Sequence, residues 1–201
     1  MPVKTLRMLP RALVGLALAV ALLSTSVAQA RGLAPAEQRA SLLSLLDGHH
    51  FRVDRKTFDR LGSPKEITNH LVHFTVDPKL RPTMRQRAIA GLRVYPSQRT
   101  RKILEGLLYD PDLQNTAGVA LRREAMLSLA IAFRAGAVTA IANHHEDANP
   151  QIREGCARAL GATRSTDALP LLDAWLPNEP ELFVRLAVDK AIAYIRGQSS
   201  R

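Results

Sequence analysis

Cysteine, aromatic residues and alternating apolar–polar stretches are all scarce in this chain of 201 residues. Cys156 is the only cysteine, so an intramolecular disulfide is excluded and the fold depends on packing. Aromatic residues make up only 4% of the chain, and no strand-like alternation of useful length is present. The apolar fraction of 46% comes mainly from alanine and leucine, which both favour helix. The sequence therefore predicts an all-α protein with about one ordinary domain.

The motifs of common enzymes are also absent from the sequence. It contains no Gly-rich phosphate loop, no nucleophile elbow around a serine and no CxxC pair. Glu146 and Asp147 are adjacent carboxylates, but they fall in a predicted loop without an apolar pocket that would raise one pKa. We therefore predict no catalytic residue, no cofactor and no enzymatic activity.

Histidine gives the one pattern that a metal ion could use. His70 and His73 lie three residues apart in a predicted helix, and Glu66 and Asp77 are the nearest carboxylates. We interpret these two histidines as surface residues of the helix and predict no metal site. His145 occupies an apolar position near a predicted helix end, where the helix dipole favours a partly buried histidine.

The first thirty residues differ in composition from the rest of the chain. A basic start is followed by an apolar run over residues 12–23, which is shorter than the roughly 20 residues that a membrane-spanning helix needs. Ala28 and Ala30 fit the small-x-small rule for signal cleavage. We therefore predict a signal peptide over residues 1–30, export to the periplasm or the medium, and no transmembrane span after cleavage.

Basic residues outnumber acidic ones, and the net charge at pH 7 is +10. Three of the 28 Lys and Arg residues, but none of the 18 Asp and Glu residues, lie in residues 1–30, so residues 31–201 carry +7. A basic surface attracts nucleic acid, lipid headgroups, acidic glycans and acidic proteins. Because an exported protein rarely meets nucleic acid, we expect the other three classes of partner and no nucleic acid.

Four segments of the chain align on an arginine, with spacings of 37, 31 and 32 residues. Around each arginine, offsets −1, +3 and +7 are almost always apolar and offset +6 is always small. These offsets lie on one face of an α-helix, which predicts a buried face with close helix–helix approach. Cys156 occupies the +3 offset, which predicts a buried, unreactive thiol. The four arginines are Arg85, Arg122, Arg153 and Arg185.

A second helix is predicted after each of the first three arginines. Asp110, Asp147 and Asn178 follow their arginines by 25 residues, at the turn into the next unit, and Asp77 holds the same turn before the first unit. The predicted units lie near residues 77–110, 111–147, 148–178 and 179–196.

The pattern weakens at both ends of the repeats. Residues 31–76 contain a weaker helical pattern, and we predict an atypical N-terminal helical capping region there, because a terminal unit has one face in water. Residues 197–201 are predicted to be a disordered tail.

The best-matching repeat reads Asp147-x-x-Pro150-x-Ile152-Arg153-x-x-Cys156-x-x-Ala159-Leu160-Gly161. This pattern resembles the HEAT repeat family, especially its short bacterial subtype related to phycobilin lyases, over about residues 77–196. The resemblance implies a short right-handed α-solenoid of helical pairs. It also implies an inter-repeat ladder in which the turn residues Asp77, Asp110, Asp147 and Asn178 meet Arg85, Arg122, Arg153 and Arg185. Because Asn178 is not acidic, the last rung is expected to be weaker.

Five basic residues fall at offsets away from the predicted core face. In HEAT proteins such helices usually line the concave side, where a basic stripe would suit an acidic partner. We therefore expect a non-enzymatic scaffold or adaptor that binds a protein partner. A basic module for anionic polymers or lipid headgroups is the alternative, a lyase-like enzyme is a weaker one, and a plain solvated charged face also fits the pattern. The five residues are Arg87, Arg93, Arg123, Arg158 and Lys190.

Overall fold

The computed structural model describes residues 33–199, with side chains to residue 197. The chain divides into two compact units, Met1–Ala34 and Pro35–Arg201, and the helices described below lie in the second. The predicted signal peptide, with Ala28 and Ala30, lies outside the described residues. Within residues 33–199 every regular element is a helix, so the all-α fold class is confirmed.

Three helices form the N-terminal part of this unit, where we predicted a capping region. They are α2 (Pro35–Asp47), α3 (Arg55–Asp59) and α4 (Pro64–Val76). Asp54 caps α3 by accepting hydrogen bonds from the backbone N–H groups of Lys56 and Thr57, and Ser63 forms a full capping box with Glu66 at the start of α4. Helices α2 and α4 both contact the next helix, α5 (Pro82–Leu92).

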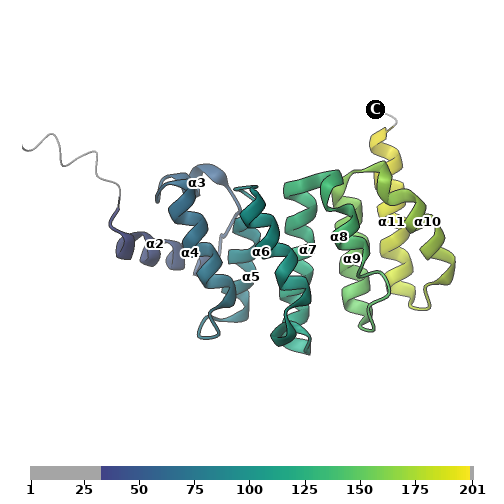
Figure 1. The fold of residues 1–201 in the computed structure, drawn as a ribbon, viewed down its shortest axis with the longest axis horizontal. Coiled ribbons are helices and arrows are strands. Elements are labelled where there is room, and N and C mark those ends of the chain that lie inside the picture. Colours follow the sequence, from purple (N-terminus) through teal and green to yellow (C-terminus); the bar gives the residue numbers. More distant parts are fainter. Residues whose placement is uncertain (1–32, 200–201) are drawn as a thin grey trace, which may run out of the picture. The chain divides into compact units, whose positions relative to one another are not determined.

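The rest of the unit is a series of helices, which Figure 1 shows side by side in chain order, and from α7 onward long helices alternate with shorter ones. Each arginine-bearing helix contacts the next one, so that α5 contacts α7, α7 contacts α9 and α9 contacts α11; each also contacts the helix that precedes it. The helices are α5 (Pro82–Leu92), α6 (Gln98–Tyr109), α7 (Val119–Phe133), α8 (Val138–Ala142), α9 (Pro150–Thr163), α10 (Leu169–Trp175) and α11 (Leu182–Ser199).

Short 3₁₀ helices connect several of these elements. They are Pro111–Leu113, Thr116–Gly118, Arg134–Ala137, Thr166–Ala168 and Leu176–Asn178. Helix α11 runs to Ser199, three residues into the segment for which we predicted a disordered tail. Its sequence there contains no proline, and a single glycine is tolerated within a helix.

The repeat register predicts the core correctly. All residues at offsets −1, +3, +6 and +7 from the four arginines are buried. The small residues at offset +6 lie where neighbouring helices approach closely: a Cβ atom added at Gly91 would meet the side chains of Leu71 and Phe58 within 3.2 Å. At Gly161 it would lie 3.0 Å from the Cβ atom of Ala191, so α9 and α11 approach closely as well.

One stretch, Thr116–Ala142, is long and apolar enough by composition to cross a membrane. It is not one straight helix, because α7 ends at Phe133 and a 3₁₀ turn follows before α8. Within its most apolar window 44% is buried, and α7 packs between α5 and α9. We therefore assign this stretch to the core of the helical unit.

Candidate binding surface

The four repeat arginines bind backbone carbonyl groups at the end of the preceding turn or helix. Arg85 donates from Nε to the carbonyl of Thr75 at 2.9 Å, and Arg122 donates in the same way to Leu108 at 3.2 Å. The last four carbonyl groups of a helix have no partner within that helix, so these arginines satisfy groups that would otherwise be unpaired. In the remaining repeats, Arg153 donates to the carbonyl of Asp147, and Arg185 to those of Glu179 and Pro180.

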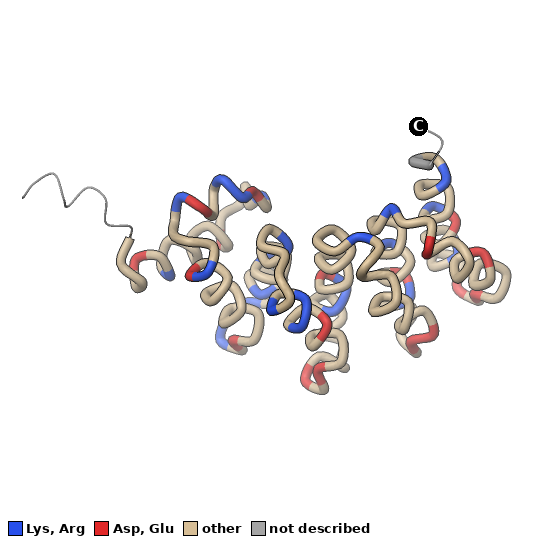
Figure 2. Tube along the Cα trace, turned by 45° about the horizontal axis from the view of Figure 1, so that its top comes forward, with Lys and Arg blue, Asp and Glu red and all other residues tan. Residues whose placement is uncertain are grey.

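Two of these arginines also form ion pairs with a carboxylate at the following turn. Arg122 lies 2.6 Å from Asp147, and both side chains are largely buried. Asp77 instead lies 3.8 Å from Arg39, and Asp110 accepts a hydrogen bond from the backbone N–H of Asp112. Figure 2 shows acidic residues at the turns along one end of the helices. These contacts join elements of the fold, so the arginines are engaged in structure rather than open to a ligand.

The acidic partner at the last of these turns is Glu179, and the expected position, Asn178, is not. Asn178 is exposed and donates to the carbonyl of Ala174. Glu179 is buried and binds Arg153 through both oxygens, at 2.9 and 2.7 Å. Glu179 follows Arg153 by 26 residues, whereas the expected spacing is 25. The 3₁₀ helix Leu176–Asn178 precedes it directly and brings it, rather than Asn178, to the turn that faces Arg153. The carboxylate at this turn therefore comes from Glu179 and binds Arg153, whereas Arg185 donates to the backbone carbonyls of Glu179 and Pro180.

Burial and hydrogen bonding act in opposite directions on Glu179. Burial raises the pKa of its carboxyl group, but hydrogen bonds from Arg153, from the backbone N–H of Glu181 and from Trp175 outweigh it and hold the pKa below the ordinary value of 4.5. This carboxyl group therefore stays ionised inside the protein at neutral pH.

The first two residues of the predicted basic surface are engaged within the protein. Arg87 donates to the carbonyl groups of Leu46 and Gly48 at 2.6 and 3.0 Å, and its guanidinium lies over the ring of Phe51. Arg93 lies 3.5 Å from Glu124, whose pKa is raised by burial. Sequence offsets alone did not show these contacts, because the partners lie up to 41 residues away in the chain.

The other three predicted residues lie nearer the C-terminus, on α7, α9 and α11. Arg123 and Arg158 both pair with the buried carboxylate of Glu154. The side chain of Arg158 is 70% exposed despite this pair, and Lys190 on α11 is exposed. Arg158 and Lys190 therefore present positive charge to solvent, and both line the groove described next.

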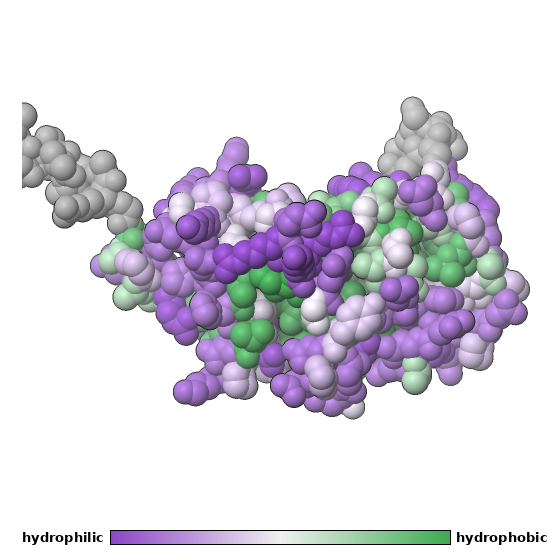
Figure 3. Space-filling view, viewed as in Figure 1, coloured by the Kyte–Doolittle hydropathy of each residue, from purple (hydrophilic) through white to green (hydrophobic). Residues whose placement is uncertain are grey.

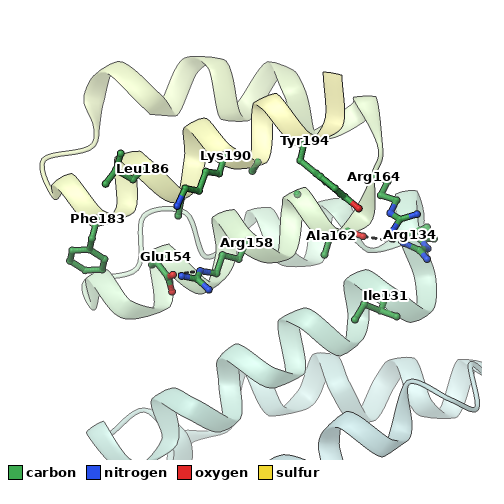
Figure 4. A pocket seen from close by; sticks show the side chains of 13 residues that line it. Ile131, Arg134, Glu154, Arg158, Ala162, Arg164, Phe183, Leu186, Lys190 and Tyr194 are labelled. Carbon is green, nitrogen blue, oxygen red and sulfur yellow. Dashed lines mark hydrogen bonds and ion pairs between the residues drawn. The ribbon is translucent and has the colours of Figure 1, made fainter. Parts of the chain in front are cut away.

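A groove of about 890 Å³ lies over α7, α9 and α11 (Figure 4). Its α11 wall is a stripe in which Phe183, Leu186, Lys190 and Tyr194 follow one another at helical spacing. The three apolar members are 45%, 50% and 42% exposed, which is unusual for large apolar side chains. Elsewhere, Figure 3 shows a side of the molecule that is mainly hydrophilic, with apolar areas in separate patches.

Two arginines close one end of this groove with backbones in an unfavourable conformation. Arg134, after α7, has a φ of 51°, and Arg164, after α9, has a φ of 57°; within residues 33–197 they are the only non-glycine residues with positive φ. Such a backbone costs on the order of 1–3 kcal/mol for a residue with a Cβ atom. Arg134 donates to the carbonyl of Ala162, and Arg164 lies over the ring of Tyr194 (Figure 4).

Sequence reasoning missed this groove, although a signal for it was present. The core offsets on α11 are occupied by residues 184, 188, 191 and 192. Phe183, Leu186 and Tyr194 lie off those offsets, and large apolar residues away from a core face indicate a second contact surface. The sequence did not predict the positive φ of Arg134 and Arg164, because residues other than glycine uncommonly adopt a positive φ.

The remaining reactive side chains are buried or isolated. The Cys156 thiol is buried and donates to the carbonyl of Ile141 at 3.2 Å, and its burial raises the pKa of the thiol. His144 is buried against the ring of Tyr109, while His145 lies beside Trp175. Within the part of the chain that the structure describes, no group of three His, Cys, Asp or Glu residues is arranged to hold a metal ion.

Comparison with known proteins does not assign this chain to a protein family. No protein-family model matches the chain, and no curated protein matches it.

Proposed function

We propose that residues 77–196 form a short HEAT-type α-solenoid and that the protein is an exported, non-enzymatic scaffold that binds an acidic protein partner. Three features support the solenoid: the repeat register of buried residues, the contacts between successive arginine-bearing helices, and the arginines that tie each helix to the preceding turn.

The open groove over α7, α9 and α11 is the observation that carries the binding function. Large apolar side chains exposed together at one place on a soluble protein are typical of a protein-binding surface. The basic residues that line the groove favour an acidic partner, because complementary charge raises the association rate and disfavours wrong partners.

A second candidate is a basic module that holds anionic polymers or lipid headgroups. The net charge of +7 over residues 31–201 favours it, since charge alone attracts such partners. It differs from the scaffold in one measurable respect: binding by charge alone weakens steeply as salt is added, whereas an apolar contact does not.

The test is capture of partners by the tagged full-length protein from its own envelope fraction, with washes at low and then high salt. A defined protein that stays at high salt, is released by Leu186→Glu and binds more weakly to Lys190→Glu supports the scaffold. Lys102→Glu, a charge reversal at an exposed lysine on α6 outside the groove, is the matched control for Lys190→Glu. Release of all bound material by salt, from every variant alike, would contradict the scaffold and favour the basic module.

A further inference from the structure

The apolar stripe of α11 has the length and spacing of a helix-binding surface. Phe183 and Tyr194, the ends of the stripe, are eleven residue steps apart, which at 1.5 Å per step is about 16 Å, or three helical turns. Opposite the stripe, α9 presents Ala162 and the close-packed Gly161, and α7 presents Ile131. An amphipathic helix would bury the exposed apolar surface on both sides of the groove.

Positive charge is distributed along this groove rather than concentrated at one point. Lys190 lies within the stripe, Arg158 lies on the facing helix, and Arg134 and Arg164 lie at the end (Figure 4). The one acidic residue that lines the groove, Glu154, is already paired with Arg123 and Arg158. The groove therefore favours an occupant with several negative charges spaced along its length.

Two other occupants fit this arrangement less well. A second copy of the chain would bring its own Lys190 and arginines to the same place, so a symmetric contact would set like charges against each other. A lipid carries one anionic headgroup and would use only one end of the groove. Its acyl chain would also lie half in water, because Phe183, Leu186 and Tyr194 are open to solvent.

We propose, on the basis of the scaffold function above, that the groove over α7, α9 and α11 binds an acidic amphipathic helix of the partner protein. The helix places its apolar face on Phe183, Leu186 and Tyr194. Arg134 and Arg164 bind carboxylates at one end of this helix. Glycine suits the backbone at both positions better than arginine does, so the cationic side chains explain why arginine is present there.

The test uses a synthetic, fluorescently labelled 18-residue peptide as the probe. Its leucines repeat at i, i+3, i+4 and i+7, its other positions carry glutamate and alanine, and a scrambled peptide of the same composition is the control. Fluorescence anisotropy at physiological salt measures binding to the full-length protein. We expect the helical peptide to bind at least tenfold more tightly than the scrambled one, and Leu186→Glu to weaken binding at least tenfold.

The double variant Arg134→Gly with Arg164→Gly separates binding from folding. Because glycine relieves both backbones, this variant should melt no lower than the parent protein while binding the peptide about three- to tenfold more weakly. Lys102→Glu should bind like the parent. Equal binding by the double variant and the parent, or equal affinity for the two peptides, would overturn the proposal.

The remaining outcomes distinguish this inference from the scaffold function. If sedimentation shows a dimer that Leu186→Glu dissociates, the occupant of the groove is a second copy of the chain. If anionic vesicles displace the peptide at equal charge, the occupant is a lipid. Either result overturns the inference. A partner captured at high salt that Leu186→Glu still binds also overturns it, but leaves the scaffold in place. Photo-crosslinking from position 186 to an acidic helical segment of a captured partner supports both.

Discussion

The guanidinium group of Arg153 on α9 holds the carboxylate of Glu179 in a two-point ion pair, with N–O distances of 2.9 and 2.7 Å. The same carboxylate accepts hydrogen bonds from Nε1 of Trp175 at 2.9 Å and from the backbone N–H of Glu181 at 3.1 Å. This cluster joins the end of α10 to the start of α11. Four donors on one buried carboxylate make it the most fully bonded acidic group among those described here.

Removal of this charge is expected to destabilise the protein strongly. Glu179→Gln leaves a largely buried guanidinium without its counter-charge, and breaking a buried pair in this way costs about 3 kcal/mol in the free energy of unfolding. Urea denaturation followed by circular dichroism measures the change. The adjacent Asn178→Ala, at an exposed position, is the control and should change stability by less than about 1 kcal/mol. Similar effects of the two substitutions would contradict the role given to Glu179.

The same carboxylate gives the stability a defined pH dependence in acid. Because the pKa of Glu179 in the folded protein is lowered from its usual 4.5, its contribution is present above that value and is lost as the pH falls through the folded pKa. We expect the stability of the parent protein to fall more steeply than that of Glu179→Gln below pH 4.5. Thermal melting of both proteins from pH 6 to pH 3 tests this, and parallel curves would refute it.

His144 is expected to cause a second loss of stability, at milder acidity. Burial lowers its pKa from 6.5, and the nearby charge of Arg122 lowers it further, so the folded protein favours the neutral ring. Its contribution is complete above pH 6.5 and declines as the pH falls below that value, where the unfolded chain binds a proton first. His144→Phe should flatten the change in melting temperature between pH 7 and pH 5, whereas His73→Gln, at an exposed position, should not. Some slope will persist from His70, whose pKa burial also lowers.

Two glycines should respond to alanine in opposite directions. A Cβ atom at Gly118 would lie 2.2 Å from the carbonyl oxygen of Leu113, and because the contact is with backbone, the 3₁₀ turn must shift. We expect Gly118→Ala to cost about 3 kcal/mol in the free energy of unfolding. At Gly106, in α6, no atom lies within 4 Å of the added Cβ, and alanine should stabilise the helix by about 1 kcal/mol. Chemical denaturation of both variants measures the change in the free energy of unfolding, which should be negative for Gly118→Ala and positive for Gly106→Ala.

Relief of the strained backbones should stabilise the protein as well. Arg164→Gly removes the steric cost of a left-handed residue, about 1 kcal/mol, and loses only the weak contact with the ring of Tyr194. Arg134→Gly should act in the same direction. Melting temperatures of the two single variants measure this, with Lys102→Gly, at an exposed position in the interior of α6, as a control that should destabilise. A lower melting temperature for both groove variants would show that their side chains are needed for folding.

Much of this arrangement could be predicted from the sequence, because it follows from local rules. Helical spacing identified the buried faces, and the structure adds residues of common capping types, Ser63 and Asn149, at the starts of α4 and α9. The partner of Arg153 could not be predicted, because one 3₁₀ turn shifts the acidic residue by a single position. Arg87 and Arg93 were expected at the surface, and their actual neighbours depend on how α2 and α7 pack against α5. The groove depends in the same way on the spacing of three helices.

Asp147 has a consequence for how the protein unfolds, because two successive helices hold the same residue. Arg122 on α7 binds its carboxylate, and Arg153 on α9 binds its carbonyl oxygen. Opening the turn at Asp147 therefore breaks a contact of each helix at once. Cooperativity in this region is thus carried by a shared turn as well as by apolar packing. Amide hydrogen exchange should accordingly show α7 and α9 exchanging as one unit, with a common free energy of opening.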